Sequence, residues 1–113
     1  MSKLQIHVGG TFEDTERRVL DAIARHERGE TVEEHHLNFE NWQIFARVMT
    51  ANRLELLHYV HRNPPKSILA LSKALGRDYR RVHEDVETLV QAGLLDRDDT
   101  GFRADYDSIQ IAM

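Results

Sequence analysis

The sequence contains no cysteine, only two prolines and few aromatic residues, which make up 7% of its 113 residues. The lack of cysteine excludes disulfide bridges, zinc sites built on cysteine and catalysis by a thiol. No apolar run approaches the roughly 20 residues that a membrane-spanning helix needs. The N-terminal MSKLQIHV lacks the long apolar stretch and cleavage site of a signal peptide, so we expect a cytoplasmic protein.

The residues that are present suit one small folded domain, with at most a small attached subdomain. Hydrophobic residues make up 41% of the chain and charged residues 30%, enough for a core and for a solvated surface. We find no nucleophile motif and no phosphate-binding loop. The sequence therefore predicts neither enzymatic activity nor a cofactor.

The charge is unevenly distributed along the chain. The net charge is −4 over the whole sequence, yet the stretch 62–81 carries six Lys and Arg against one acid, a local charge of +5. The first 49 residues carry −3, from six basic and nine acidic residues. A basic patch on an acidic body suits docking in a DNA groove, because only the contacting face must neutralise phosphates. The alternative is that these basic side chains only lie on solvated helix faces and keep the protein soluble.

The stretch from Leu71 to Leu95 has the pattern of two helices joined by a tight turn. Gly76 stands where a left-handed C-cap ends the first helix, and Asp78 is placed to cap the second. Gly93 ends the second helix. The buried stripe of this second helix is expected to consist of Val82, Val86, Leu89 and Val90, which recur at spacing i, i+4, i+7 and i+8.

The order L-S-K-A-L-G-x-D-x-x-x-V-x-x-x-V-x-x-L-x-x-x-G-L-L resembles the winged helix-turn-helix of MarR- and ArsR-like bacterial transcription regulators, over roughly Thr50 to Tyr106. With QIHVGGTFED ahead and YDSI behind, the whole chain resembles small DNA-binding proteins of that class, some of which are assigned as antitoxins beside a toxin gene. The resemblance implies an α+β fold, a winged helix-turn-helix with a small N-terminal βαβ-like extension. It also implies a repressor that binds double-stranded operator DNA as a homodimer.

Side chains of the second helix that lie off its apolar stripe are candidate DNA-binding residues. In the resembled family, major-groove positions correspond to Arg77, Tyr79, Arg80, Arg81, His83 and Glu84. An arginine there can bond guanine O6 and N7 in bidentate fashion. Phosphate contacts are expected from Lys66, Ser67 and Lys73, and contacts with the backbone or minor groove from Arg97 and Arg103. This interpretation requires Arg80 and Arg81 to face outward.

Three positions of the second helix have alternative interpretations. Tyr79, three residues before Val82, could instead close the core. Glu84 and Asp85 depart from the resembled pattern, because acids on a recognition helix repel phosphate. They could accept a hydrogen bond from cytosine, or they could pair within the protein with Arg77, Arg80 or Arg81.

Residues 1–49 are expected to form an extension used for dimerisation or partner binding. Leu4, Ile6 and Val8 alternate as in a strand, and Leu37 and Phe39 suggest a second strand. A helix between them is predicted to bury Val19, Leu20, Ile23 and Ala24. Two strands around one helix make a βαβ-like unit, in which the strands can be parallel neighbours.

Residues 50–113 are expected to form the DNA-binding domain with a C-terminal tail. Thr50 and Ser67 are predicted helix caps, and the packing residues of the first of these helices are Leu54, Leu57 and Tyr59 or Val60. A hairpin with its turn near Thr100-Gly101 would form the wing. Alternation of Ile109, Ile111 and Met113 predicts a tail strand, which either pairs within the chain or serves a dimer or another partner.

The seven histidines include a pair three apart on a helix, His58 and His61, and the adjacent His35-His36. Some ArsR-like proteins sense metals, but the cysteine ligands of many such sensors are absent here. We expect no metal site.

Three functional hypotheses remain. The chain is a DNA-binding repressor, or an antitoxin that also clamps a toxin protein and autoregulates its operon, or a winged helix used only for protein contacts. The first two are compatible with each other. Net acidity is the feature that favours the third.

Overall fold

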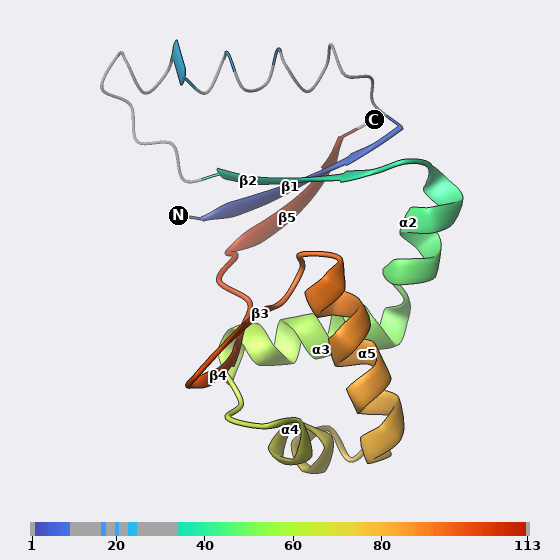
Figure 1. Ribbon diagram of the computed structural model, residues 1–113, viewed down its shortest axis with the longest axis vertical. Coiled ribbons are helices and arrows are strands. Elements are labelled where there is room, and N and C mark those ends of the chain that lie inside the picture. The colour runs from blue at the N-terminus through green and yellow to red at the C-terminus, as the bar shows by residue number, and fades with distance from the viewer. Residues whose placement is uncertain (1, 10–16, 18–19, 21–22, 25–33, 113) are drawn as a thin grey trace. The chain divides into compact units, whose positions relative to one another are not determined.

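The computed structural model describes residues 2–9, 17, 20, 23–24 and 34–112 (Figure 1). The described elements are α+β: four helices, α2 to α5, and five strands in two sheets. Contacts divide the chain into two units. Unit 1 comprises residues 1–45 and 106–113, and unit 2 comprises residues 46–105.

Unit 1 contains a three-stranded parallel sheet in the order β2-β1-β5, with β1 in the middle (Figure 1). The strands are β1 (Lys3–Val8), β2 (Glu34–Phe39) and β5 (Ser108–Ala112). Leu4 and Ile6 of β1 are completely buried, as the apolar alternation predicts. The expectation that the first two predicted strands are parallel neighbours is confirmed, with Leu4 opposite His35 and Ile6 opposite Leu37.

The tail strand β5 pairs within the chain, which settles one alternative left open by the sequence. Its partner is β1, with Leu4 opposite Ile109 and Ile6 opposite Ile111. The Asp107 N–H donates to the Ser2 carbonyl at 2.9 Å, and the Ser2 N–H donates to the Asp107 carboxylate at 3.0 Å. This C-terminal tail was predicted to belong to one domain with residues 50–105, whereas contacts place it in unit 1.

The helix expected between β1 and β2 lies mostly outside the described residues, and so does Val19. Arg17, Leu20, Ile23 and Ala24 are described and helical. Leu20 is 58% exposed and Ile23 50% exposed. The prediction that these two side chains are buried in this chain is wrong.

Helix α2 (Trp42–Val48) connects the two units. The Ile44 N–H donates to Oδ1 of Asn41 at 2.9 Å, which satisfies a free donor at the start of the helix. The buried Phe45 ring meets the rings of Phe39 and Trp42 edge to face. The ring contacts fix the beginning of α2 against β2.

Unit 2 consists of α3 (Ala51–Arg62), α4 (Ile68–Leu75), α5 (Tyr79–Gln91) and a hairpin of β3 (Asp96–Asp98) and β4 (Gly101–Arg103). Side-chain oxygens cap all three helices, as predicted. The Thr50 hydroxyl accepts from the Arg53 N–H at 3.3 Å, and the Ser67 hydroxyl accepts from the Ala70 N–H at 3.1 Å. These caps satisfy donors that have no partner within the helix.

The core of unit 2 is apolar. It consists of Leu56, Leu57, Val60, Leu71, Val82, Val86, Leu89, Leu94, Leu95, Phe102 and Ala104. The predictions for Leu57 and Val60 are confirmed. Leu54 is 49% exposed, so its predicted place in the core is wrong, and Leu56 lies in the core instead. Three helices and the hairpin share this core, which fixes one side of α5.

The hairpin has the predicted position, with its turn at Asp99 and Thr100. It is tied to the chain ahead of α4 by the Phe102 N–H, which donates to the Pro65 carbonyl at 3.0 Å. Phe102 is buried. The hairpin thus packs on the helical part of unit 2 through one strand.

Candidate nucleic-acid interface

Helix α5 begins directly after a tight turn that ends α4. Gly76 has φ 64° and ψ 34°, and its N–H donates to the carbonyl oxygens of Lys73 and Ser72. This left-handed conformation costs glycine no steric clash. The Asp78 carboxylate then accepts from the Arg81 N–H at 3.2 Å and caps α5. Both predicted turn residues are confirmed, and they fix where α5 starts.

One side of α5 is buried along its length. Val82, Val86 and Leu89 have no exposed surface, and Val90 is partly buried. The predicted stripe is therefore confirmed at three positions and partly at the fourth. Because an α-helix repeats every 3.6 residues, the opposite side of α5 is left for solvent or for a partner.

Arg80 and Arg81 lie on the exposed side of α5. The Arg80 side chain is 87% exposed, and its Nε lies 3.8 Å from Oε1 of Glu84. Arg81 is exposed as well. An exposed pair at i,i+4 is weak, so Arg80 can exchange Glu84 for a phosphate or a base. Neither arginine is turned into the core, as the DNA-binding interpretation requires.

Tyr79 and His83 extend the same exposed surface. Tyr79 is 48% exposed, which makes the alternative of a core tyrosine wrong. Its ring centroid lies 6.0 Å from that of His83, which is also exposed. The first two turns of α5 thus present two basic and two aromatic side chains together with the acid Glu84.

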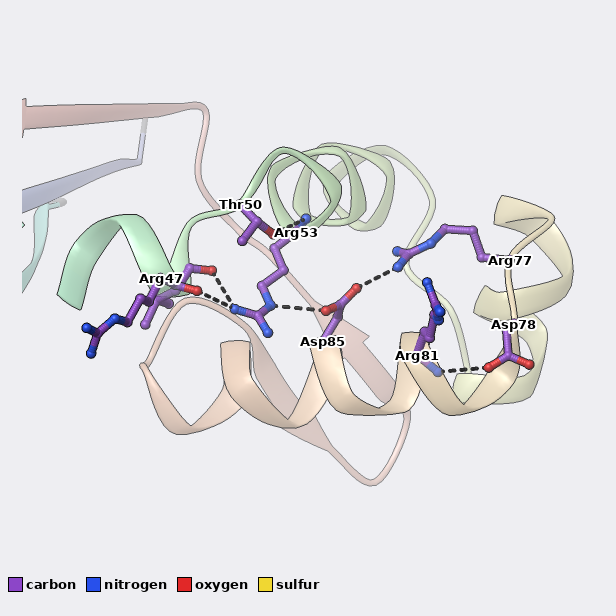
Figure 2. A network of polar contacts seen from close by, with 8 residues as sticks. Arg47, Thr50, Arg53, Arg77, Asp78, Arg81 and Asp85 are labelled. Carbon is purple, nitrogen blue, oxygen red and sulfur yellow. Dashed lines mark hydrogen bonds and ion pairs between the residues drawn. The ribbon is translucent and has the colours of Figure 1, made fainter. Parts of the chain in front are cut away.

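Asp85 lies on the same helix but faces the protein (Figure 2). Its Oδ1 accepts from Nε of Arg53 at 3.0 Å, and its Oδ2 accepts from an NH2 group of Arg77 at 2.8 Å. Another nitrogen of Arg53 donates to the carbonyl oxygens of Arg47 and Val48, at 2.7 and 3.1 Å. Figure 2 shows this chain of contacts running from the end of α2, through Asp85, to the turn before α5.

The network assigns roles to two residues with open interpretations. Asp85 pairs internally with Arg77, one of the partners considered for it, and also with Arg53. Glu84 stays exposed beside Arg80. The Arg77 side chain is partly buried and held by Asp85, whereas the side chains of Arg80 and Arg81 are exposed.

Helix α4 and the residues just ahead of it offer a second set of polar groups. Lys66, Ser67 and Lys73 are all exposed, the first two at the start of the helix and Lys73 in its last turn. The Ser67 hydroxyl accepts the Ala70 N–H in capping α4, and the hydroxyl hydrogen remains available as a donor. The N-terminus of α4 with Lys66 beside it favours anions.

Both arginines of the hairpin have partners within unit 2. Arg97 pairs with Glu87 of α5, and its guanidinium carbon lies 5.2 Å from the centroid of the Phe102 ring. Arg103 pairs with Asp98 at 2.7 Å and with Asp105 at 3.9 Å. Both side chains are about half exposed. These contacts stabilise the hairpin and leave less of each charge for a partner.

Asp98 organises the hairpin turn. Its Oδ1 accepts from the N–H of Thr100 at 2.8 Å and from the Thr100 hydroxyl at 2.5 Å. These hydrogen bonds lower the pKa of Asp98 from its ordinary value of 3.8, the hydroxyl more than the N–H, and the charge of Arg103 lowers it further. The turn is therefore built around an ionised carboxylate.

Within the part of the chain that the structure describes, every helix is too short or too polar to span a bilayer. The same residues contain no group of three or more His, Asp or Glu side chains placed to hold a metal ion. His61 instead lies with its Nδ1 2.7 Å from the carbonyl oxygen of Ala104. His58 is exposed on the same helix, and His35 meets the Tyr106 ring edge to face.

The comparison with protein families gives one finding. The family model HVO_A0114 matches residues 48–111. This chain belongs to the HVO_A0114 family. The match begins at the last residue of α2 and covers α3 to α5, the hairpin and most of β5, whereas β1 and β2 precede it. No curated protein and no solved structure matches the chain.

The contact of Arg53 with Asp85 in this HVO_A0114 family protein was not predicted from the sequence. Arg53 lies 32 residues from Asp85 in the chain, so no local spacing connects the two. A signal was present at Asp85, which directly precedes Val86 and borders the buried stripe. An acid at the edge of a core needs a basic partner or hydrogen-bond donors. The partner itself follows only from the packing of α3 on α5.

Proposed function

We propose that this HVO_A0114 family protein is a sequence-specific DNA-binding regulator of transcription that acts as a cytoplasmic repressor, without catalysis or a cofactor. In this proposal α3, α4, α5 and the β3–β4 hairpin form a winged helix-turn-helix with α5 as its recognition helix. The observation that carries the proposal is the outward face of α5. Arg80 and Arg81 project from it, away from a stripe in which Val82, Val86 and Leu89 are completely buried.

The exposed side chains divide into two roles. Arg80 and Arg81 are long enough to reach guanine O6 and N7 in the major groove, and each good bidentate pair discriminates by about 1–3 kcal/mol. Tyr79 and His83 lie beside them and can contact bases or sugars. Lys66, Ser67 and Lys73 supply phosphate contacts, which position the protein without reading sequence.

The hairpin has a smaller role in this proposal than the sequence suggested. Arg97 and Arg103 are engaged with Glu87 and Asp98, and the hairpin turn adds the exposed acid Asp99. Acids near the phosphate backbone oppose binding. Affinity is therefore expected to come mainly from α5 and from α4 with the residues just ahead of it.

A homodimer on a palindromic operator completes the proposal. A recognition helix reads only a few base pairs, and two copies related by a two-fold axis read two half-sites about one helical turn apart. This doubles the contacts without a longer protein. The expected partner is therefore double-stranded DNA with inverted repeats.

The test is binding to the DNA upstream of the protein's own gene, by fluorescence anisotropy at two salt concentrations. The double variant Arg80→Ala with Arg81→Ala should lose about 1–3 kcal/mol of operator affinity per arginine that reads a base. If either arginine also neutralises a phosphate, the slope of log affinity against log salt becomes shallower by about one for each.

The control variant removes the same charge elsewhere, by Lys3→Ala with Arg47→Ala. Both residues lie outside α4, α5 and the hairpin, so this variant should keep most of the affinity. Equal losses of operator affinity in the two variants would mean that net charge, and not contacts from the recognition helix α5, accounts for DNA binding. Absence of any salt-dependent binding by the unmodified protein would rule the proposal out.

A second candidate function is an antitoxin that binds a toxin protein through unit 1. The observation that favours it is a set of apolar side chains exposed in unit 1: Leu20, Ile23, Ile109 and Ile111. Exposed apolar side chains can be covered by a protein partner. Co-expression with the product of the adjacent reading frame tests it. A stable, salt-insensitive complex without any DNA binding would instead favour a winged helix used only for protein contacts.

A further inference from the structure

The contacts of Asp85 join three segments that are separate in the sequence. Asp85 lies in the second turn of α5, Arg53 in the first turn of α3, and Arg77 in the turn between α4 and α5. Arg53 also holds the last carbonyl groups of α2. The Asp85 carboxylate therefore links α5 to the start of α3, to the turn between α4 and α5 and, through Arg53, to the end of α2 (Figure 2).

We infer that Arg53, Asp85 and Arg77 are positioning residues that determine DNA sequence specificity without touching DNA. The inference rests on the proposed function. Burial of the apolar stripe of α5 has no directional preference of its own, because the hydrophobic effect is non-directional. Hydrogen bonds to both oxygens of one carboxylate are directional. Together they fix the rotation of α5 and hence the direction in which Arg80 and Arg81 project.

Stability alone is a weak explanation for this network. Asp85 is buried, and the side chains of Arg53 and Arg77 are 18% and 24% exposed. Removing three charged groups from water costs free energy that their attraction only partly returns, and apolar side chains of similar volume often stabilise as well or better. What apolar replacements would not supply is directional geometry.

The network also keeps Arg81 available for DNA. Arg81 precedes Asp85 by four residues, a spacing at which an acid and a base on one helix pair. Both oxygens of Asp85 are already engaged by Arg53 and Arg77. Among the described residues, the Arg81 guanidinium has no carboxylate partner within salt-bridge distance.

The test compares Asp85→Asn with Glu55→Gln. Each substitution removes one negative charge from unit 2, and Glu55 is an exposed residue of α3 outside both the network and the proposed DNA-binding set. Electrostatics alone predicts that both variants bind DNA more tightly. A positioning role predicts that Asp85→Asn loses about tenfold to a hundredfold in operator affinity, with undiminished affinity for unrelated DNA. Glu55→Gln should lose affinity for neither DNA.

A second variant covers the case in which Asp85→Asn does not fold. Arg77→Gln removes one of the two ion pairs and should lower the ratio of specific to nonspecific affinity with an unchanged salt slope. A shallower slope, by about one, would identify Arg77 as a phosphate contact and overturn its positioning role. Operator affinity of Asp85→Asn equal to that of Glu55→Gln would overturn the inference as a whole.

A measurement without DNA separates this inference from the proposed function. Amide hydrogen exchange in the first two turns of α5 should be faster in Asp85→Asn than in Glu55→Gln, because only the former releases the helix from α3 and the preceding turn. Equal exchange would show that the network positions nothing. If the unmodified protein bound no DNA but the exchange differed as expected, the proposed function would fail while the positioning of α5 stood.

Discussion

At the scale of single residues, the backbone of unit 2 leaves room for only glycine at one position of the hairpin. Gly101 has φ 132°, and a Cβ placed on it would lie 2.2 Å from the carbonyl oxygen of Pro65. The next residue, Phe102, donates its N–H to the same oxygen at 3.0 Å. A side chain at residue 101 would therefore separate the hairpin from the segment ahead of α4.

Gly101→Ala is expected to lower the free energy of unfolding by about 3 kcal/mol or more, from an unfavourable φ together with a backbone clash. Gly76→Ala is the matched control. Its φ of 64° also disfavours alanine, but no atom lies within 4 Å of the added Cβ, so the expected cost is about 1–2 kcal/mol. Urea unfolding followed by circular dichroism measures both. Equal costs would mean that the contact with Pro65 is not maintained in solution.

Asp98 predicts an acid-sensitive hairpin turn. Its pKa in the folded protein is lowered by hydrogen bonds from Thr100, the hydroxyl first, and by the charge of Arg103. Because the folded pKa lies below the ordinary value of 3.8, its contribution to stability is complete above that value and is lost as the pH falls through the folded pKa. The Thr100 amide shift, followed by NMR from about pH 5 downward, should titrate with this lowered pKa. In Asp98→Asn the titration should disappear.

At the scale of elements, α3 and α5 show how far an apolar pattern determines burial. Leu89 of α5 and Leu54 of α3 were both expected in the core from their spacing. The structure buries Leu89 completely and leaves Leu54 49% exposed, with Leu56 buried instead. The pattern on α5 is sharp, because polar residues surround its stripe. On α3 the apolar residues Leu54, Leu56 and Leu57 surround more of the helix, and the neighbouring elements determine which of them is buried.

Leu89→Ala and Leu54→Ala make the same chemical change on two helices and should differ widely in effect. Leu89→Ala should cost about 2–5 kcal/mol, from lost burial and from the cavity left in the core. Leu54→Ala should change the free energy of unfolding by about 0.5 kcal/mol or less. Thermal or urea unfolding of both variants measures the difference. A large loss for Leu54→Ala would mean that this side chain is covered in solution, for example in a dimer.

At the scale of the whole molecule, the chain contributes its two ends to one unit and its middle to the other. The strand β5 (Ser108–Ala112) returns to pair with β1, which begins at Lys3. Residues 46–105 have an apolar core of their own. The unit proposed to read DNA is therefore continuous in the sequence, whereas the sheet of unit 1 needs both ends of the chain.

A protein that ends at Asp105 should keep unit 2 and damage unit 1. It loses β5, so amides of β1 should exchange faster, because one of the two neighbours of β1 is gone. The circular dichroism signal from α3, α4 and α5 should persist. A matched control is the full-length chain with Ile111→Thr, which keeps the strand with a β-branched residue. Loss of the helical signal in the truncated protein would show that unit 2 depends on unit 1.

The sequence by itself determined the local structure of unit 2. The caps Thr50, Ser67 and Asp78 and the left-handed Gly76 act between residues at most four apart, so their residue types are sufficient to predict them. The same holds for the stripe on α5 and the position of the hairpin. The outward side of Arg80 and Arg81 follows from that stripe, because a helix of fixed period has only one side opposite its core.

Tertiary structure alone decided which distant groups meet. The bond from Arg53 to Asp85 joins residues 32 apart, and the Ser2–Asp107 contact joins residues 105 apart. Arg77 had two interpretations, as a DNA contact and as a partner of Asp85, and the structure shows it 2.8 Å from Asp85. Such contacts depend on the relative position of whole elements, which is set by the sum of many nondirectional apolar contacts. No spacing along the chain encodes that sum.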